Sequence, residues 1–168
     1  MGGALTMAET LGSLVDKLSI KHLRLWHLEE ALERQSDAGE VRQALAARRD
    51  LVLQQCQELR EEIDVFFAAA LAGRVKIRDE KVKLYDNRGA EPTGRIARLG
   101  EAVSELALRN IRCWHLEDEV RRTDLPDREI VSLKRQIDAN NQERNDLMDK
   151  VDEILWNEAR RRAKSPAD

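Results

Sequence analysis

Hydrophobic residues recur at helical spacing along most of the chain, with polar residues filling the positions between them. Spacings of three, four and seven are typical of helices that bury one face. The pattern predicts helices over residues 8–34, 38–72, 94–122 and 123–162. We expect Asp37 and Glu40 to form a capping box for the second helix, Gly73 to end it, and Thr93 to cap the third. Pro126 lies in the first turn of the fourth helix, where proline is tolerated.

The chain contains this pattern twice. Residues 11–64, shifted by 88, match 15 of 54 positions identically without a gap, including the string WHLE at 26–29 and 114–117. The match also keeps the helical phase, which indicates an internal duplication. Each copy predicts an antiparallel helical hairpin, so the fold class is all-α, a four-helix bundle with a pseudo-twofold axis. We expect one domain over 1–168, with unit one at about 8–72, unit two at about 94–162 and a basic tail at 160–168.

The segment between the units has a different period. Val75 and Ile77, and then Val82 and Leu84, alternate with lysines and other polar residues. Alternation of this kind is typical of strands. It predicts a short β-hairpin over 74–91, which would need to lie against the helices or meet another copy, since an isolated hairpin is barely stable.

Polar residues occupy the apolar stripes at positions that should face the core. In the first and third helices they fall at the same two places of the repeat, and the second and fourth helices each place an arginine on the stripe. A buried carboxylate requires a partner, and arginine supplies a forked, permanently charged one. We therefore predict a buried polar network of His22, Glu29, Arg49, Asn110, Glu117, Asn140 and Arg144.

Three interpretations of this network remain open. It can be an ion-pair layer that fixes helix register, a polar pocket in the centre of the bundle, or a set of groups at the bundle edge if the stripe is phased wrongly. Under the first interpretation, Glu117→Ala is strongly destabilising because Arg144 is left buried and unpaired.

A second, narrower stripe runs along the first and third helices of the predicted bundle. It contains Leu23 and His27 in one unit and Ile111 and His115 in the other. Its repetition suggests an interface, covered by the β-hairpin or by a partner chain, and a homodimer follows as the expected assembly. Trp26 and Trp114 lie beside the main stripe and predict core packing.

Acidic residues also gather on one side of the fourth helix. Asp138, Asp149 and Asp152 lie there with Gln142 and Asn145. Such a row is usually a solvated face, but it can also hold magnesium for cleavage of a nucleotide pyrophosphate. We expect no metal and no cofactor, and keep these aspartates as the weaker alternative.

Composition narrows the class of protein. The net charge is −3 with 36% charged residues, and no basic surplus indicates a nucleic-acid partner. No apolar run has the length of a membrane span, and no secretory leader is recognisable, so we expect a cytoplasmic protein. Cys56 and Cys113 have no metal-ligand spacing and are predicted to be reduced, buried thiols.

The sequence also resembles a known family. The WHLED string at 114–118, the run from Leu133 to Asp138 and the NQERND string at 141–146 resemble the WHLED, RRID and NQxRxD pattern of a bacterial family of all-helical proteins of unknown function. The segment 81–87 resembles the lysine-rich strand of that family, ending in tyrosine, and the order of the hairpins resembles a circular permutation. The resemblance implies a helical fold and no activity.

Neither a phosphate-binding glycine loop nor a nucleophile beside a base occurs. The sequence therefore favours a non-enzymatic, self-associating interaction or scaffold protein. The alternative is an enzyme or small-ligand binder that uses the Glu/Arg centre or the acidic face on a phosphorylated or nucleotide compound.

Overall fold

The computed structural model of the chain describes residues 9–36, 39–78 and 93–164. It consists of the helices α1 (Leu11–Arg34), α2 (Glu40–Leu71), α3 (Leu99–Val120) and α4 (Asp127–Lys164), with a 3-10 turn at Thr93–Arg95. The all-α fold class is confirmed for these residues. None of the helices described has both the length and the apolar character to cross a membrane.

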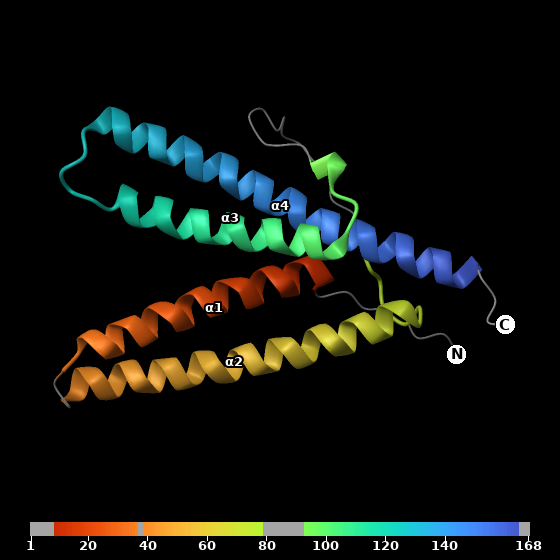
Figure 1. The fold of residues 1–168 in the computed structure, drawn as a ribbon, viewed down its shortest axis with the longest axis horizontal. Coiled ribbons are helices and arrows are strands. Elements are labelled where there is room, and N and C mark those ends of the chain that lie inside the picture. The colour runs from red at the N-terminus through yellow and green to blue at the C-terminus, as the bar shows by residue number, and fades with distance from the viewer. Residues whose placement is uncertain (1–8, 37–38, 79–92, 165–168) are drawn as a thin grey trace.

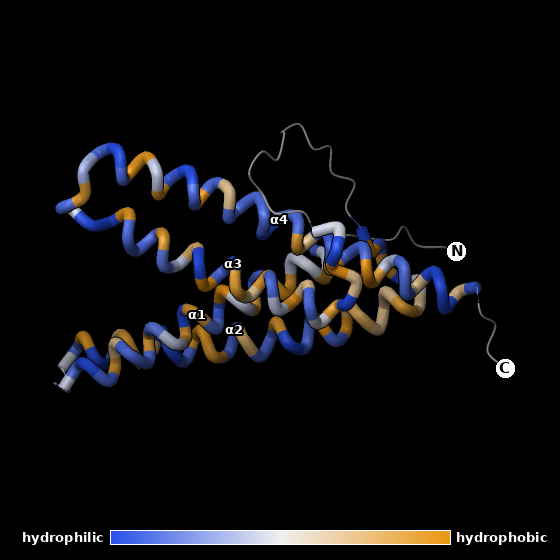
Figure 2. The backbone as a smooth tube through the Cα atoms, turned by 45° about the horizontal axis from the view of Figure 1, so that its top comes forward, coloured by the Kyte–Doolittle hydropathy of each residue, from blue (hydrophilic) through white to orange (hydrophobic). Residues whose placement is uncertain are grey.

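The helices form two antiparallel hairpins, α1–α2 and α3–α4, which we call unit one and unit two (Figure 1). Both loops lie at the same end of the molecule, and α1 and α3 run in the same direction. The units approach each other near the other end and diverge toward their loops, as the views in Figures 1 and 2 agree. Apolar and polar residues are intermixed along every helix, as expected for helices that bury one face (Figure 2).

Each hairpin repeats one cross-helix contact. In unit one, Lys21 Nζ donates to Gln55 Oε1 at 2.5 Å. The residues 88 positions further on form the matching contact in unit two, where Arg109 Nε lies 2.5 Å from Glu143 Oε2. The duplication seen in the sequence is therefore also present in how each hairpin is held together.

The apolar core lies where the two units meet. It contains the buried side chains of all four helices and of the segment that follows α2: Leu11, Ala70, Ile77, Ala102, Val151 and Leu155. Burying apolar side chains from every helix in one cluster stabilises the fold through the hydrophobic effect. The divergent arms toward the loops lie outside this cluster.

Gly12 allows α1 to cross α4 at close range. A Cβ at this position would lie 2.2 Å from the carbonyl oxygen of Met148, so only glycine fits. The Gly12 amide donates to Asp152 Oδ1 at 2.8 Å, which places a carboxylate at the positive end of α1. Thr10 caps the same end by accepting from the Ser13 amide.

The helix ends confirm one predicted signal and correct another. Gly73 ends α2 with φ +67°, and the amides of Gly73 and Arg74 donate to the carbonyls of Ala70 and Ala69, as in a Schellman motif. Gly39 is the N-cap of α2, and Asp37, which was predicted to cap this helix in a capping box, lies outside the described residues. Thr93 begins the 3-10 turn instead of capping α3, whose N-cap is Arg98.

The β-hairpin predicted over 74–91 is not supported. Residues 74–78 form no strand, and 79–91 lie outside the described part of the chain. Val75 is half-buried and Ile77 is 5% exposed in the core, while Lys76 and Arg78 are exposed. An extended segment that crosses a core alternates in burial whether or not it pairs with another strand, because successive side chains point in opposite directions. This explains why the sequence pattern was misleading.

Candidate functional site

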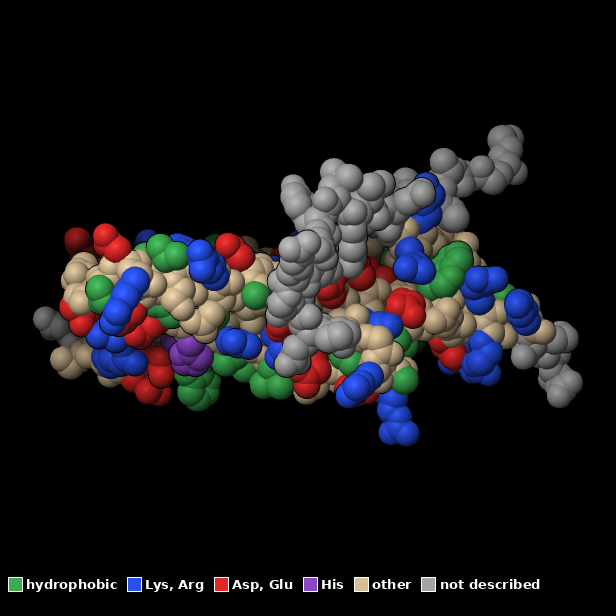
Figure 3. Space-filling view, turned by 90° about the horizontal axis from the view of Figure 1, so that it is seen from above, with side chains coloured by type: hydrophobic (Ala, Val, Ile, Leu, Met, Phe, Trp, Pro, Cys, Tyr) green, Lys and Arg blue, Asp and Glu red, His purple; other side chains and the backbone are tan. Residues whose placement is uncertain are grey.

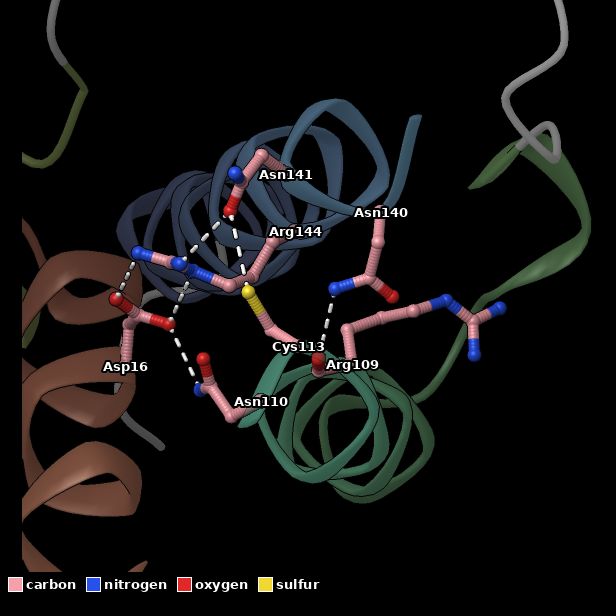
Figure 4. A network of polar contacts seen from close by, with 7 residues as sticks. All are labelled: Asp16, Arg109, Asn110, Cys113, Asn140, Asn141 and Arg144. Carbon is pink, nitrogen blue, oxygen red and sulfur yellow. Dashed lines mark hydrogen bonds and ion pairs between the residues drawn. The ribbon is translucent and has the colours of Figure 1, made fainter. Parts of the chain in front are cut away.

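A buried polar network links the two units (Figure 4). Asp16 of α1 is 5% exposed and accepts from Asn110 Nδ2 of α3 at 2.9 Å. Its two carboxylate oxygens also meet Arg144 of α4, with Nε at 3.1 Å from Oδ1 and Nη2 donating to Oδ2 at 3.2 Å. Three helices thus converge on one carboxylate, and the forked guanidinium holds it from two directions.

The network continues inside unit two. Arg144 Nη1 donates to Asn141 Oδ1 at 3.1 Å, and the Cys113 thiol lies 3.7 Å from the same oxygen. Asn140 is 1% exposed and its Nδ2 donates to the carbonyl of Arg109 at 2.8 Å. These contacts join α3 to α4 along the side chains that Figure 4 draws. Of these contacts, the one from Asn141 orients the Arg144 side chain that binds Asp16 of unit one.

Four of the seven predicted network residues lie elsewhere. His22 and Glu29 are exposed, and Glu117 is half-buried. Arg49 turns to the neighbouring Asp50, with Nε at 2.7 Å from Oδ1. The predicted stripe places Asn110 correctly, but Glu29 is exposed and Glu117 is only half-buried, so neither glutamate belongs to the apolar core.

The remaining three predicted residues lie in the network: Asn110, Asn140 and Arg144. The sequence interpretation gave Arg144 the wrong partner, because its carboxylate is Asp16 and not Glu117. Asp16 was missed since it lies off the apolar stripe of α1 and has only Ser104 as its counterpart in unit two. The one feature of the sequence that could have drawn attention to Asp16 is that the two copies differ there, with aspartate in unit one and serine in unit two.

The histidines and tryptophans of the WHLE strings also lie differently from the prediction. The His27 ring stacks on Trp114 across the two units, with centroids 4.3 Å apart and planes 8° from parallel. His27 therefore faces the other unit and not the outside. Its neighbour on the stripe, Leu23, is half-buried. Trp26 is 62% exposed and is not a core residue.

The same contact rules out the predicted pseudo-twofold axis. A twofold that relates the units would turn the His27–Trp114 stack into a second stack of His115 on Trp26. Both His115 and Trp26 are exposed. Unit one presents its histidine and unit two presents its tryptophan, so the units associate through two different faces.

A hollow of about 410 Å³ lies between α3 and α4. Three exposed arginines, Arg112, Arg128 and Arg135, surround it, and Asn140 and Glu143 lie at its base. Asn140 Oδ1 is buried and has no hydrogen-bond partner among the residues that the structure describes. The arginines can bind an anionic group, and the amide oxygen can accept from a donor on the same ligand.

The three aspartates of the acidic row on α4 have different surroundings. Asp138 is exposed, Asp149 is half-buried, and Asp152 is buried against the amide of Gly12. Among the residues that the structure describes, no group of three or more histidine, cysteine or acidic side chains is arranged to hold a metal ion. Asp152 instead stabilises the junction of α1 and α4.

Comparison with known families places the chain. A family model described as "Protein of unknown function (DUF4254)" matches residues 2–78 and 100–168. The chain belongs to this family. The two matched DUF4254 segments contain α1–α2 and almost all of α3 with α4, so the family pattern covers both units and omits the segment between them. No curated protein matches the chain, and no solved structure matches it.

Proposed function

We propose that this DUF4254 protein is a non-enzymatic interaction protein that associates with itself. The observation that carries this proposal is the exposed apolar surface along α1 and α3. Trp26 is 62% exposed, Leu108 49% and Ile111 41%. Leu108 and Ile111 are three residues apart and share one side of α3, and neighbouring exposed apolar side chains of this kind are typical of protein–protein interfaces, since water contact with them is unfavourable.

The polar network supports the same proposal. Asp16 binds both Asn110 and Arg144, and Arg144 also donates to Asn141. This is the arrangement of a structural layer that fixes how two hairpins dock. The free thiols of Cys56 and Cys113 support a cytoplasmic location, where cysteines stay reduced.

Charge does not favour a nucleic-acid partner. Basic and acidic side chains are interspersed over the face seen in Figure 3, and lysines and arginines gather at the end of the molecule where α4 finishes. The net charge is −3. Nucleic-acid interfaces usually form a continuous basic surface, whereas interspersed charge suits a soluble surface around an apolar contact.

Sedimentation velocity over a wide concentration range tests the proposal. We expect the weight-average sedimentation coefficient to rise with concentration or to correspond already to more than one 19.3 kDa chain. A single species with the mass of one chain at every concentration would contradict self-association.

A second candidate function rests on the arginine-lined hollow of unit two. Arg112, Arg128 and Arg135 suit a phosphorylated or nucleotide compound, and Asn140 Oδ1 suits a hydroxyl or amine on it. Thermal-shift measurements with inorganic phosphate and with nucleotides test this candidate. Stabilisation that Arg135→Ala abolishes would support it, and the absence of any shift at millimolar ligand would remove it.

A further inference from the structure

Each unit carries a histidine and a tryptophan in its WHLE string, and the contact between the two units uses only one of these from each unit. His27 of unit one stacks on Trp114 of unit two. Their counterparts, His115 and Trp26, are exposed. The chain therefore has one completed contact of this kind and the two separate halves of a second.

These halves point away from the completed contact. Adjacent residues on an α-helix are about 100° apart around its axis, so the histidine and the tryptophan of one WHLE string face two different neighbours. Unit one uses its histidine for unit two, and its tryptophan is directed elsewhere. Unit two uses its tryptophan for unit one, and its histidine is directed elsewhere.

The free histidine belongs to a larger apolar face. Leu108, Ile111 and His115 are spaced by three and four residues, so they share one side of α3. Leu108 and Ile111 are 49% and 41% exposed. Their counterparts at the same spacing in unit one, Ile20 and Leu23, are half-buried.

We infer that a second copy of this chain completes the arrangement, with Trp26 of each copy stacked on His115 of the other. This inference rests on the proposed self-association and names its surfaces. The copy is the natural occupant because it carries the complementary half of a contact that the chain already makes internally. The two intermolecular contacts are related by the twofold axis of a closed dimer.

The angle between the two faces fits closure with two chains. A dimer of this kind is a ring of four units, in which the units of the two copies follow one another. Each unit then has two neighbours, in directions about 90° apart. This angle is close to the roughly 100° between adjacent residues of a helix. Six units in a ring need about 120°. Because α1 and α3 run in the same direction (Figure 1), a ring whose axis runs along the helices is compatible with this arrangement.

The intermolecular contact lacks the polar lock of the internal one. The counterparts of Asp16, Asn110 and Arg144 are Ser104, His22 and Cys56, which carry no ion pair between the units. The dimer therefore depends on aromatic and apolar contacts, and we expect it to dissociate reversibly on dilution while the internal contact stays formed.

Light scattering on the full chain and three variants tests this inference. Trp26→Asp and Ile111→Asp each disrupt one of the proposed faces and should weaken dimerisation at least about 30-fold, as loss of a central interface residue does. Trp156→Asp is the matched control, because Trp156 is also an exposed tryptophan (37%) but lies on α4 outside both faces. It should leave the dissociation constant unchanged within about twofold, with circular dichroism checking that every variant keeps its helices.

Mixing distinguishes the pairing of the faces. A mixture of the Trp26→Asp and Ile111→Asp chains keeps one intact contact, since Trp26 of one chain meets His115 of the other, and the mixed dimer should re-form in part. A dimer that survives both substitutions, or that re-forms in no mixture, would overturn this inference while leaving self-association in place. A wild-type chain that stays monomeric would instead overturn the proposed function.

Discussion

Gly12 and Gly100 occupy the same position in the two units, but only Gly12 lies against another helix. A methyl group at Gly12 meets the rigid backbone of Met148, whereas nothing lies within 4 Å of one at Gly100. We expect Gly12→Ala to lower the free energy of unfolding by about 3 kcal/mol, as overpacking against backbone does. Gly100→Ala should be neutral or raise it by up to about 1 kcal/mol, because alanine favours helix. Urea unfolding of both variants checks this, and equal effects would contradict the close crossing of α1 and α4.

Asp16 supplies the second prediction at this scale. Asp16→Ala leaves Asn110 and Arg144 without their carboxylate, and we expect a loss of about 2–3 kcal/mol in the free energy of unfolding. The loss is less than for a fully buried pair because Arg144 keeps 24% exposure. The exposed counterpart variant, Ser104→Ala, should change stability by less than about 0.5 kcal/mol.

The substitution Glu117→Ala distinguishes the observed network, in which Arg144 binds Asp16, from the predicted one, in which Arg144 binds Glu117. Arg144 is held by Asp16, so removing the Glu117 carboxylate should cost less than about 1 kcal/mol in denaturant unfolding. A loss equal to that of Asp16→Ala would show that Arg144 depends on Glu117 after all.

The sequence could place Arg144, Asn110 and Asn140 in a core layer from helical phase alone. It could not pair them, because the partner comes from a different unit.

At the scale of the helices, Cys56 reports on the packing of α1 against α2. Its side chain is fully buried, and burial raises the pKa of the thiol while Arg60 and Lys21 act in the opposite direction. At a given pH a smaller fraction is thiolate than for an ordinary cysteine, so its alkylation should be slow and should accelerate as pH rises. We expect mass spectrometry to find half-buried Cys113 alkylated first under native conditions, and Cys56 only as denaturant opens the hairpin. Faster labelling of Cys56 than of Cys113 would contradict the packing of unit one.

The helices themselves were largely predictable, because apolar spacing depends on the helix's own period. The end of α2 at Gly73 followed from the conformational freedom of glycine, which the positive φ there requires. The segment at 75–78 was not predictable in the same way. Its alternation records which side chains enter the core, and a single extended segment produces that pattern as well as a paired strand does.

At the scale of the whole molecule, the duplication was visible in the sequence but the asymmetry of its packing was not. Two units with the same WHLE string suggested a twofold, yet the differences that decide the docking are few. Asp16 stands against Ser104, and Gly12 lies in a crossing that Gly100 does not share. The fit between complete hairpins decides which unit contributes its histidine to the contact and which its tryptophan. A local sequence pattern carries no information on this fit.

The proposed dimer depends on contact between the Trp26 face of one chain and the His115 face of the other. Isotope-filtered NOE spectra on a mixture of methyl-labelled and unlabelled chains test it most directly, since they report only contacts between different molecules. We expect NOEs between the Ile111 methyl group of one chain and the Trp26 indole of the other, with their loss in Trp26→Asp. Intermolecular NOEs that involve neither residue, or none at a concentration where the chain is dimeric, would contradict it.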